Sequence, residues 1–281
     1  MYHITNMPLF GSAAYLAGVK LLCNVMDKRE AMSIPKPVMV LYNAVQVVIN
    51  FYVAYYIAMA TGGWVFGLGL KDTPMVRYGV WLHYLCKVGS PTVVHLNVAR
   101  AALLHPLHHA DRDACSRACV VCIPVPPPLT LLPLSLSQYL DFTDTLIIIL
   151  RKKSEQLSFL HLWHHSTIAI VWGWVVNTWP TENSSAAYAY GAWINSCIHV
   201  IMYFYYMCTA MNIRPPTYLK KAVTSCQLTQ FASCIVHAVS ALFLDVTPIQ
   251  YNCVQVLYHI GMLKLFLPLL LGKKPSAKKQ A

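Results

Sequence analysis

Charged residues are scarce in this sequence, and acidic ones are the scarcest. Only 11% of the 281 residues are Asp, Glu, Lys or Arg, and ten acidic residues stand against 21 basic ones. Soluble domains carry about 25% charged residues, so the composition excludes a fold that faces water on all sides. Hydrophobic residues make up 57% of the chain, which is typical of a polytopic membrane protein.

The sequence also lacks a complete zinc pattern and any motif for nucleic-acid binding. Cys115, Cys119 and Cys122 form the one cysteine cluster, and no second Cys or His pair at zinc-ligand spacing accompanies it, so no metal site is predicted. The net charge is +11, but Lys and Arg form short clusters rather than a basic stripe. We therefore expect membrane lipids with anionic headgroups, or an anionic ligand at one membrane face, and no nucleic acid.

Long apolar runs are the main feature of the chain. A helix needs about 17 to 25 apolar residues to cross the hydrocarbon core. The runs that meet this length lie at 8–26, 39–60, 159–177, 185–211, 219–242 and 250–271. A seventh span should end with LDFTDTLIIIL at 140–150, although its first half is not contiguous. The sequence thus predicts an all-α membrane protein of seven transmembrane helices, forming one membrane-embedded domain over 1–281.

Basic residues indicate how these spans are oriented. They concentrate at 27–37, 151–153, 212–221 and 272–281, whereas 178–184 contains no Lys or Arg. By the positive-inside rule the basic segments are cytosolic, and so is the C-terminus. The final residues KKQA, with Lys278 and Lys279, resemble the dilysine retrieval signal of endoplasmic reticulum proteins. We therefore expect a multi-pass protein of the endoplasmic reticulum membrane.

The proline-rich segment 88–138 does not fit this pattern. Its prolines interrupt it too often for a membrane-spanning helix, and it is too apolar for an ordinary loop. Without it, WLHYLCK joins YLDFTDTLIIILRKK and gives one uninterrupted helix that ends in basic residues. Valine codons begin with GT and one glutamine codon ends with AG, so a segment from Val88 to Gln138 has the form of a retained intron. The alternative is a genuine insertion that is disordered or loosely collapsed.

Three histidines stand at the start of the 159–177 run. His161, His164 and His165 have the spacing i, i+3 and i+4, so His161 shares a helical face with the other two. Burying three imidazoles in a membrane span is costly, and such residues are usually functional.

Other spans carry polar residues at helical spacing, which predicts a polar cavity inside a helical bundle. These residues are Asp141, Asp144, Asn195, His199, Tyr203, Gln227 and Gln230.

Several ordered motifs resemble the ELO family of fatty acid elongases. They are LYNAVQVVINFYVAYY from Leu41, LDFTDTLIIILRKKSEQLSFLHLWHH, NSCIHVIMYFYY and TSCQLTQF. The family motif K-x-x-E-x-x-D-T occurs only when 88–138 is removed, as Lys87 followed by Asp141, Asp144 and Thr145, with Asp141 in place of the more common Glu. The resemblance implies seven helices, six of them in a barrel around a narrow acyl tunnel.

The resemblance also implies an activity and roles for residues. It implies a 3-ketoacyl-CoA synthase that condenses a long-chain acyl-CoA with malonyl-CoA, with no bound cofactor, alongside the reductases and dehydratase of the elongation cycle. By resemblance His164 is the nucleophile, His199 assists it, and His161 and His165 orient the site. Gln156 and the Asn195–Ser196 pair resemble the polyunsaturated-acyl branch of the family.

The remaining residues have supporting roles in this interpretation. Those expected to support the site are Lys87, Asp141, Asp144, Asn195, Tyr203, Gln227 and Gln230. Those expected to bind the CoA phosphates, unless they only mark the cytosolic face, are Arg151, Lys152, Lys153, Lys220 and Lys221.

Two rival classes remain. HPLHH at 105–109 is a second H-x-x-H-H, and two such boxes suggest a membrane di-iron desaturase or hydroxylase, but those enzymes use three boxes and no third occurs among the twelve histidines. A seven-helix receptor or transporter would explain the spans but not the clustered histidines.

Overall fold

The computed structural model describes residues 7–88, 140–179 and 185–272. The helices in these residues are α1 (Met7–Asp27), α2 (Lys36–Ala60), α3 (Pro74–Val88), α6 (Leu140–Leu150), α7 (Phe159–Thr178), α8 (Ala189–Ala210), α9 (Thr217–Leu244) and α10 (Ile249–Leu270). The described part of the chain contains no strand beyond one isolated bridge, between Lys71 and Ser185. The all-α prediction is confirmed.

Six of the expected spans coincide with helices to within a few residues at each end. By length and composition α1, α2, α9 and α10 could each cross a membrane. Helices α7 and α8 have 20 and 22 residues, which is a sufficient length for a span, but they are not among these four. The seventh expected span is divided between α3 and α6, with 15 and 11 residues. The fold is that of a polytopic membrane protein, and the count of seven spans stays a prediction.

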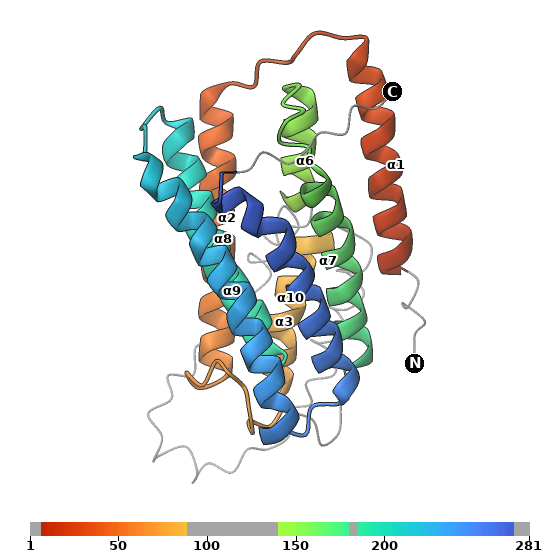
Figure 1. The fold of residues 1–281 in the computed structure, drawn as a ribbon, viewed down its shortest axis with the longest axis vertical. Coiled ribbons are helices and arrows are strands. Elements are labelled where there is room, and N and C mark those ends of the chain that lie inside the picture. Colours follow the sequence, from red (N-terminus) through yellow and green to blue (C-terminus); the bar gives the residue numbers. More distant parts are fainter. Residues whose placement is uncertain (1–6, 89–139, 180–184, 273–281) are drawn as a thin grey trace, which may run out of the picture.

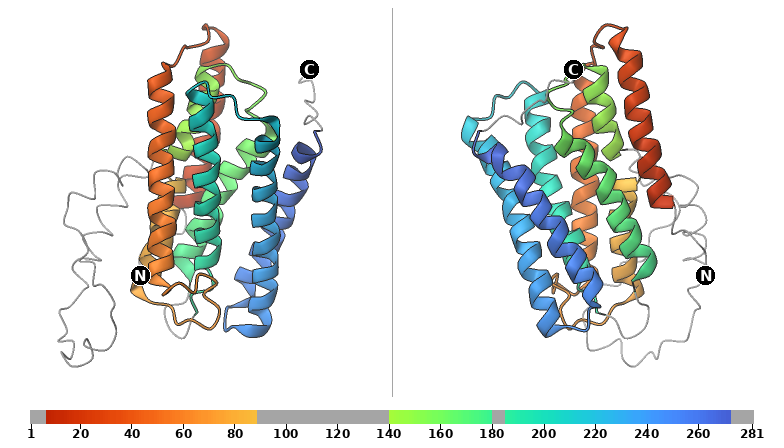
Figure 2. Two further views of the ribbon diagram at one scale, coloured as in Figure 1. Left: turned by 90° about the vertical axis from the view of Figure 1, so that its left-hand side faces the viewer. Right: turned by 45° about the vertical axis from the view of Figure 1, so that its right-hand side comes forward.

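Six helices form a closed ring. Helix α2 packs on α3, α3 on α7, α7 on α10, α10 on α9, α9 on α8, and α8 on α2. Helix α1 lies outside the ring against α6 and α7 (Figure 1). The two further views show the helices running along the long axis of the bundle (Figure 2). This arrangement matches the six-helix barrel that the resemblance implies.

Helices α3 and α6 follow one another along the bundle rather than lying side by side. Their ends are in contact, and α6 continues beyond the last turn of α3 toward the top of Figure 1. Helix α3 includes Val88, one residue of the segment 88–138, and the rest of that segment lies outside the described residues. The two helices therefore occupy the place in the ring that the seventh expected span would fill.

The two ends of the bundle differ in character. At one end, called the basic end, lie the connections 28–35, 151–158 and 211–216, at the top of Figure 1. At the opposite end, the connection 61–73 packs against the residues that precede α8. Gly67 has φ +68°, and a Cβ atom there would lie 2.2 Å from the carbonyl oxygen of Ala186, so only glycine fits this approach.

Polar contacts hold this connection in place. The backbone amide of Ala186 donates to the carbonyl of Leu70 at 2.8 Å. Asp72 accepts a hydrogen bond from Tyr188 Oη at 2.9 Å and pairs with Arg77 at 2.6 Å. The opposite end is thus held together by contacts between segments far apart in the sequence.

Candidate active site

The first two turns of α7 carry the histidine cluster. Ser158 caps the helix by accepting a hydrogen bond from the backbone amide of His161 at 3.3 Å, which sets where the helix begins. His161 Nε2 lies 2.8 Å from Thr145 Oγ1 on α6, and its ring is 4.3 Å from that of His165. His161 is therefore anchored to α6, and His165 packs between it and His164.

His164 is held from a different side. Its Nδ1 lies 3.2 Å from Tyr258 Oη on α10, and the Tyr258 ring stacks on Trp163 with centroids 5.4 Å apart. Because Tyr258 occupies Nδ1, Nε2 is the nitrogen left for chemistry. His164 also lines a pocket between α7, α8, α9 and α10.

His199 on α8 lies beside Lys87. The Lys87 ammonium is 3.3 Å from Nδ1 and 3.4 Å from Nε2 of His199, and both side chains are buried. Since an ammonium can only donate, the ring nitrogen that it contacts must act as an acceptor. Lys87, His164, His83 and His165 also interact electrostatically with His199.

Asp144 on α6 joins three helices. It accepts hydrogen bonds from Tyr203 Oη on α8 at 2.5 Å and from Tyr42 Oη on α2 at 2.8 Å. Gln46 Nε2 in turn donates to Tyr42 Oη at 3.1 Å. A carboxylate inside a membrane bundle needs such donors, because its burial without them would be costly.

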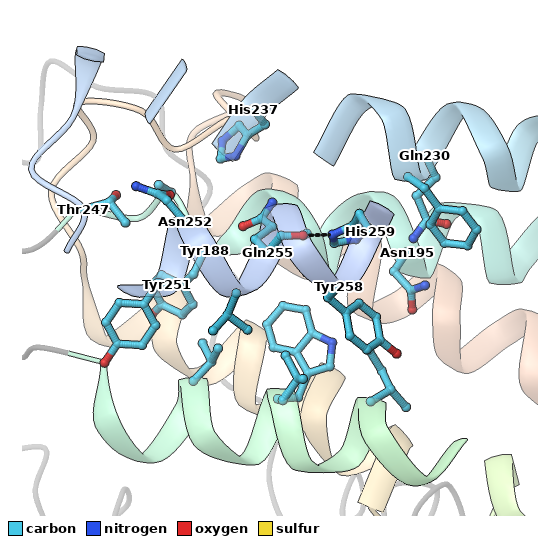
Figure 3. A pocket seen from close by; sticks show the side chains of 18 of the residues that line it. Tyr188, Asn195, Gln230, His237, Thr247, Tyr251, Asn252, Gln255, Tyr258 and His259 are labelled. Carbon is cyan, nitrogen blue, oxygen red and sulfur yellow. Dashed lines mark hydrogen bonds between the residues drawn. The ribbon is translucent and has the colours of Figure 1, made fainter. Parts of the chain in front are cut away.

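The pocket runs along the bundle from the histidine cluster toward the opposite end. At the His164 end, Asn195, Gln230, Tyr258 and His259 surround it, as Figure 3 shows. Aliphatic and aromatic side chains of α7, among them Ile168, Trp172 and Val175, form its middle. Such a wall suits an apolar chain and the polar end suits a carbonyl group.

The structure brings most of the expected site residues together, but not all. Asn195 and Gln230 line the pocket, whereas Gln227 does not and instead donates to Met202 Sδ at 3.6 Å. Asp141 belongs to α6, but its side chain lies outside what the structure describes. The expected CoA-binding residues are exposed around the basic end; they are Arg151, Lys152, Lys153, Lys220 and Lys221.

Four residues with polar side chains near the site were not expected from the sequence. Tyr42 and Tyr258 contact Asp144 and His164, His259 lines the pocket, and His83 Nδ1 lies 3.0 Å from Ser196 Oγ. Each is a polar residue inside an apolar helix, and that signal alone would have marked them as candidates.

Within the described residues no group of three or more His, Cys, Asp or Glu side chains is placed to hold a metal ion. The histidines of HPLHH at 105–109 lie outside those residues.

Similarity to known proteins identifies the family of this chain. A model of the ELO family, described as GNS1/SUR4, matches residues 126–273, slightly more than half of the chain. Fatty acid elongase 5 of Leishmania major is 32% identical over 254 residues, which are 90% of this chain and 79% of that protein. The chain belongs to the ELO family. The ELO membership favours neither the di-iron desaturase nor the receptor alternative.

Other ELO proteins show the same similarity. Fatty acid elongase 4 of Trypanosoma brucei brucei is 28% identical over 92% of this chain and 81% of its own length. Very long chain fatty acid elongase 4 of Homo sapiens is 37% identical over 153 residues, 52% of this chain and 48% of that protein. The ELO similarity to the first two relatives therefore extends over nearly the whole chain.

Proposed function

We propose that this protein is a 3-ketoacyl-CoA synthase, which condenses a long-chain acyl-CoA with malonyl-CoA and releases CO2 and CoA. Membership of the ELO family and relatives named fatty acid elongases support the activity. The observation that carries the proposal is the position of His164 in the wall of an apolar pocket, with one ring nitrogen held by Tyr258. We propose that the protein needs no resident metal or cofactor.

The first half-reaction transfers the acyl group to His164. When Nδ1–H of His164 donates to Tyr258 Oη, Nε2 keeps its lone pair and attacks the thioester carbonyl carbon. The C–S bond breaks, CoA leaves as a thiolate and takes one proton from solvent, and the product is an acyl-imidazolium. The surrounding helices keep bulk water from hydrolysing it.

The second half-reaction forms the carbon–carbon bond. Malonyl-CoA loses CO2, and the electron pair of the broken bond forms a thioester enolate. The enolate carbon attacks the acyl carbonyl, and neutral His164 leaves. The Lys87 ammonium beside His199 supplies positive charge where the malonyl carboxylate and then the enolate would lie. His161 and His165 hold the α7 cluster in position, while Asn195 and Gln230 offer amide donors to the acyl carbonyl.

The basic end suits the CoA phosphates. Lys152 and Lys153 follow α6, Lys220 and Lys221 lie near the start of α9, and all four are exposed. Lysine and arginine bind phosphate through charge-assisted hydrogen bonds. CoA bound there would place its thioester toward the polar end of the pocket.

The sequence and the family resemblance also support a membrane location and partner enzymes for this protein. We propose a multi-pass protein of the endoplasmic reticulum membrane, as the family resemblance implies, with a cytosolic C-terminus because the basic clusters gather at one end of the bundle. The reductases and dehydratase that process a 3-ketoacyl-CoA would act next. Gln156 and the Asn195–Ser196 pair support a polyunsaturated acyl substrate.

We propose that α3 and α6 are two halves of one span, and that segment 88–138 is a retained intron or an insertion that the site does not need. Lys87 and Asp144, one from each half, contact residues one helical turn apart on α8. That arrangement is expected if a continuous helix carried both.

A malonyl-CoA extension assay tests the proposed activity. Purified protein in lipid, given an acyl-CoA and malonyl-CoA labelled at its free carboxyl, should release labelled CO2 and form a 3-ketoacyl-CoA that is two carbons longer. His164→Ala should abolish both, whereas Cys253→Ala, an exposed position outside the pocket, should not. Oxygen-dependent desaturation of the acyl chain without extension would contradict the proposal.

A further inference from the structure

Three buried polar groups line the end of the pocket that lies far from His164. Trp179, His237 and Asn252 are 7%, 6% and 3% exposed. Trp179 Nε1, His237 Nδ1 and Asn252 Nδ2 have no hydrogen-bond partner among the residues that the structure describes. Buried polar atoms are nearly always paired, because an unpaired one costs free energy. A tunnel end that met only a terminal methyl group would not need them.

These groups line the same pocket as His164. Their distance from His164 is one that a long acyl chain can span. His164 and Trp179 are 15 positions apart on or just beyond α7, which corresponds to about 22 Å at 1.5 Å per residue. The extended polypeptide backbone advances about 1.2 Å per bond, and we take the same advance for an extended acyl chain. An acyl chain of about 18 carbons therefore spans that distance. Figure 3 shows Asn252 and Thr247 at one end of the pocket and Asn195, Gln230 and Tyr258 at the other.

The contacts of His237 determine whether Nδ1, which has no partner among the described residues, donates or accepts a hydrogen bond. Nε2 lies 2.7 Å from the carbonyl oxygen of Phe66, which can only accept, so Nε2 carries the hydrogen. In the neutral ring Nδ1 is then an acceptor. Stacking on Tyr190, with centroids 4.5 Å apart, holds the ring in this orientation.

The atoms that lack a partner among the described residues match a ligand group that both accepts and donates hydrogen bonds. Trp179 Nε1 and the Asn252 amide nitrogen are donors, and His237 Nδ1 is an acceptor. A hydroxyl group accepts hydrogen bonds and donates one, so it can pair with both kinds of atom. A terminal methyl group can pair with neither.

We propose that this end of the pocket is a subsite for a hydroxyl group at the ω end of the acyl chain, and that ω-hydroxyacyl-CoAs of about this length are a substrate class. The proposal rests on the proposed function, since the acyl carbonyl must lie at His164. Trp179, His237 and Asn252 bind the hydroxyl, and the apolar middle of the pocket binds the methylenes.

Two readouts test the subsite. The first is kcat/KM for malonyl-CoA-dependent extension of ω-hydroxyacyl-CoAs and methyl-ended acyl-CoAs of matched length, from about 16 to 20 carbons given the estimate above. The second is the shift in thermal unfolding caused by each acyl-CoA without malonyl-CoA, which needs no condensation. Wild-type protein should favour the ω-hydroxy chain at least tenfold in kcat/KM at the length that reaches the subsite, and it should be stabilised more by that chain.

Variants assign the preference to these residues. Asn252→Leu removes one donor at nearly constant size, and Trp179→Phe removes the other donor but keeps an aromatic ring. Each should reduce the ω-hydroxy preference by about tenfold. Asn177→Leu makes the same kind of change on an exposed α7 residue outside the pocket and should leave the preference unchanged.

The outcomes separate the two proposals. Extension of methyl-ended chains with no ω-hydroxy preference, or a preference that survives both variants, overturns the subsite and leaves the proposed function intact. Stronger stabilisation by the ω-hydroxy chain, lost in the variants but without extension of any chain, supports the subsite and contradicts the proposed function.

Discussion

Nζ of Lys87 lies 3.3 Å from Nδ1 of His199, although Lys87 is in the last turn of α3 and the next described residue after that helix is Leu140. Three polar side chains of α3 and α6 contact α8 in the order in which they occur along the chain. The pairs are His83 with Ser196, Lys87 with His199, and Asp144 with Tyr203. This order is explained if α3 and α6 together act as one helix that runs parallel to α8.

Replacing Lys87 should impair catalysis rather than folding. Lys87→Met keeps the volume of the side chain but removes the donor to His199, so we expect kcat to fall by about 100-fold, with partial recovery in Lys87→Arg. Condensation kinetics measure this. Lys20→Met changes an exposed lysine of α1 and should have no effect. A folded Lys87→Met protein with wild-type kcat would show that the ammonium plays no part.

Tyr258→Phe should lower kcat without changing the KM for malonyl-CoA. The variant keeps the stacking on Trp163 but removes the oxygen that holds His164 Nδ1, and loss of such a partner typically costs 10- to 100-fold in activity. The matched control is Tyr55→Phe, on an exposed face of α2. If both variants have equal kcat, Tyr258 does not orient the nucleophile.

Thr145→Val should destabilise the fold. Thr145 is 1% exposed, and its hydroxyl contacts His161 Nε2 at 2.8 Å and Tyr15 Oη at 2.9 Å. Removing it leaves buried partners unsatisfied, which costs about 1–3 kcal/mol. Thermal unfolding in detergent measures the loss. Thr209→Val, at an exposed threonine that bonds within its own helix, is the control. Equal unfolding temperatures for the two variants would mean that the Thr145 contacts contribute little.

Removing residues 88–138 should preserve or raise specific activity, because it joins Lys87 to Tyr139 and restores one helix. Activity per folded protein in lipid measures this. In a control chain, a Gly/Ser linker of equal length replaces the segment; it should be no more active than the full chain. A deletion that abolishes activity, while the linker chain keeps it, would show that α3 and α6 must stay separate.

The sequence predicted the helices better than it predicted their contacts. Long apolar runs located six helices because the hydrocarbon core demands a minimum length, and three clustered imidazoles identified the functional end of α7. It did not predict Tyr258 as the partner of His164, because that contact depends on which face of α10 turns toward α7. Gln227 was expected at the site for its spacing from Gln230, yet it faces Met202 on α8.

The most direct test of the account is to incubate the purified protein with an acyl-CoA in the absence of malonyl-CoA and map acyl adducts by mass spectrometry. We predict release of up to one equivalent of CoA and an acyl group on His164, chased into 3-ketoacyl-CoA when malonyl-CoA is added. An active preparation in which every histidine stays unmodified would contradict acyl transfer to imidazole.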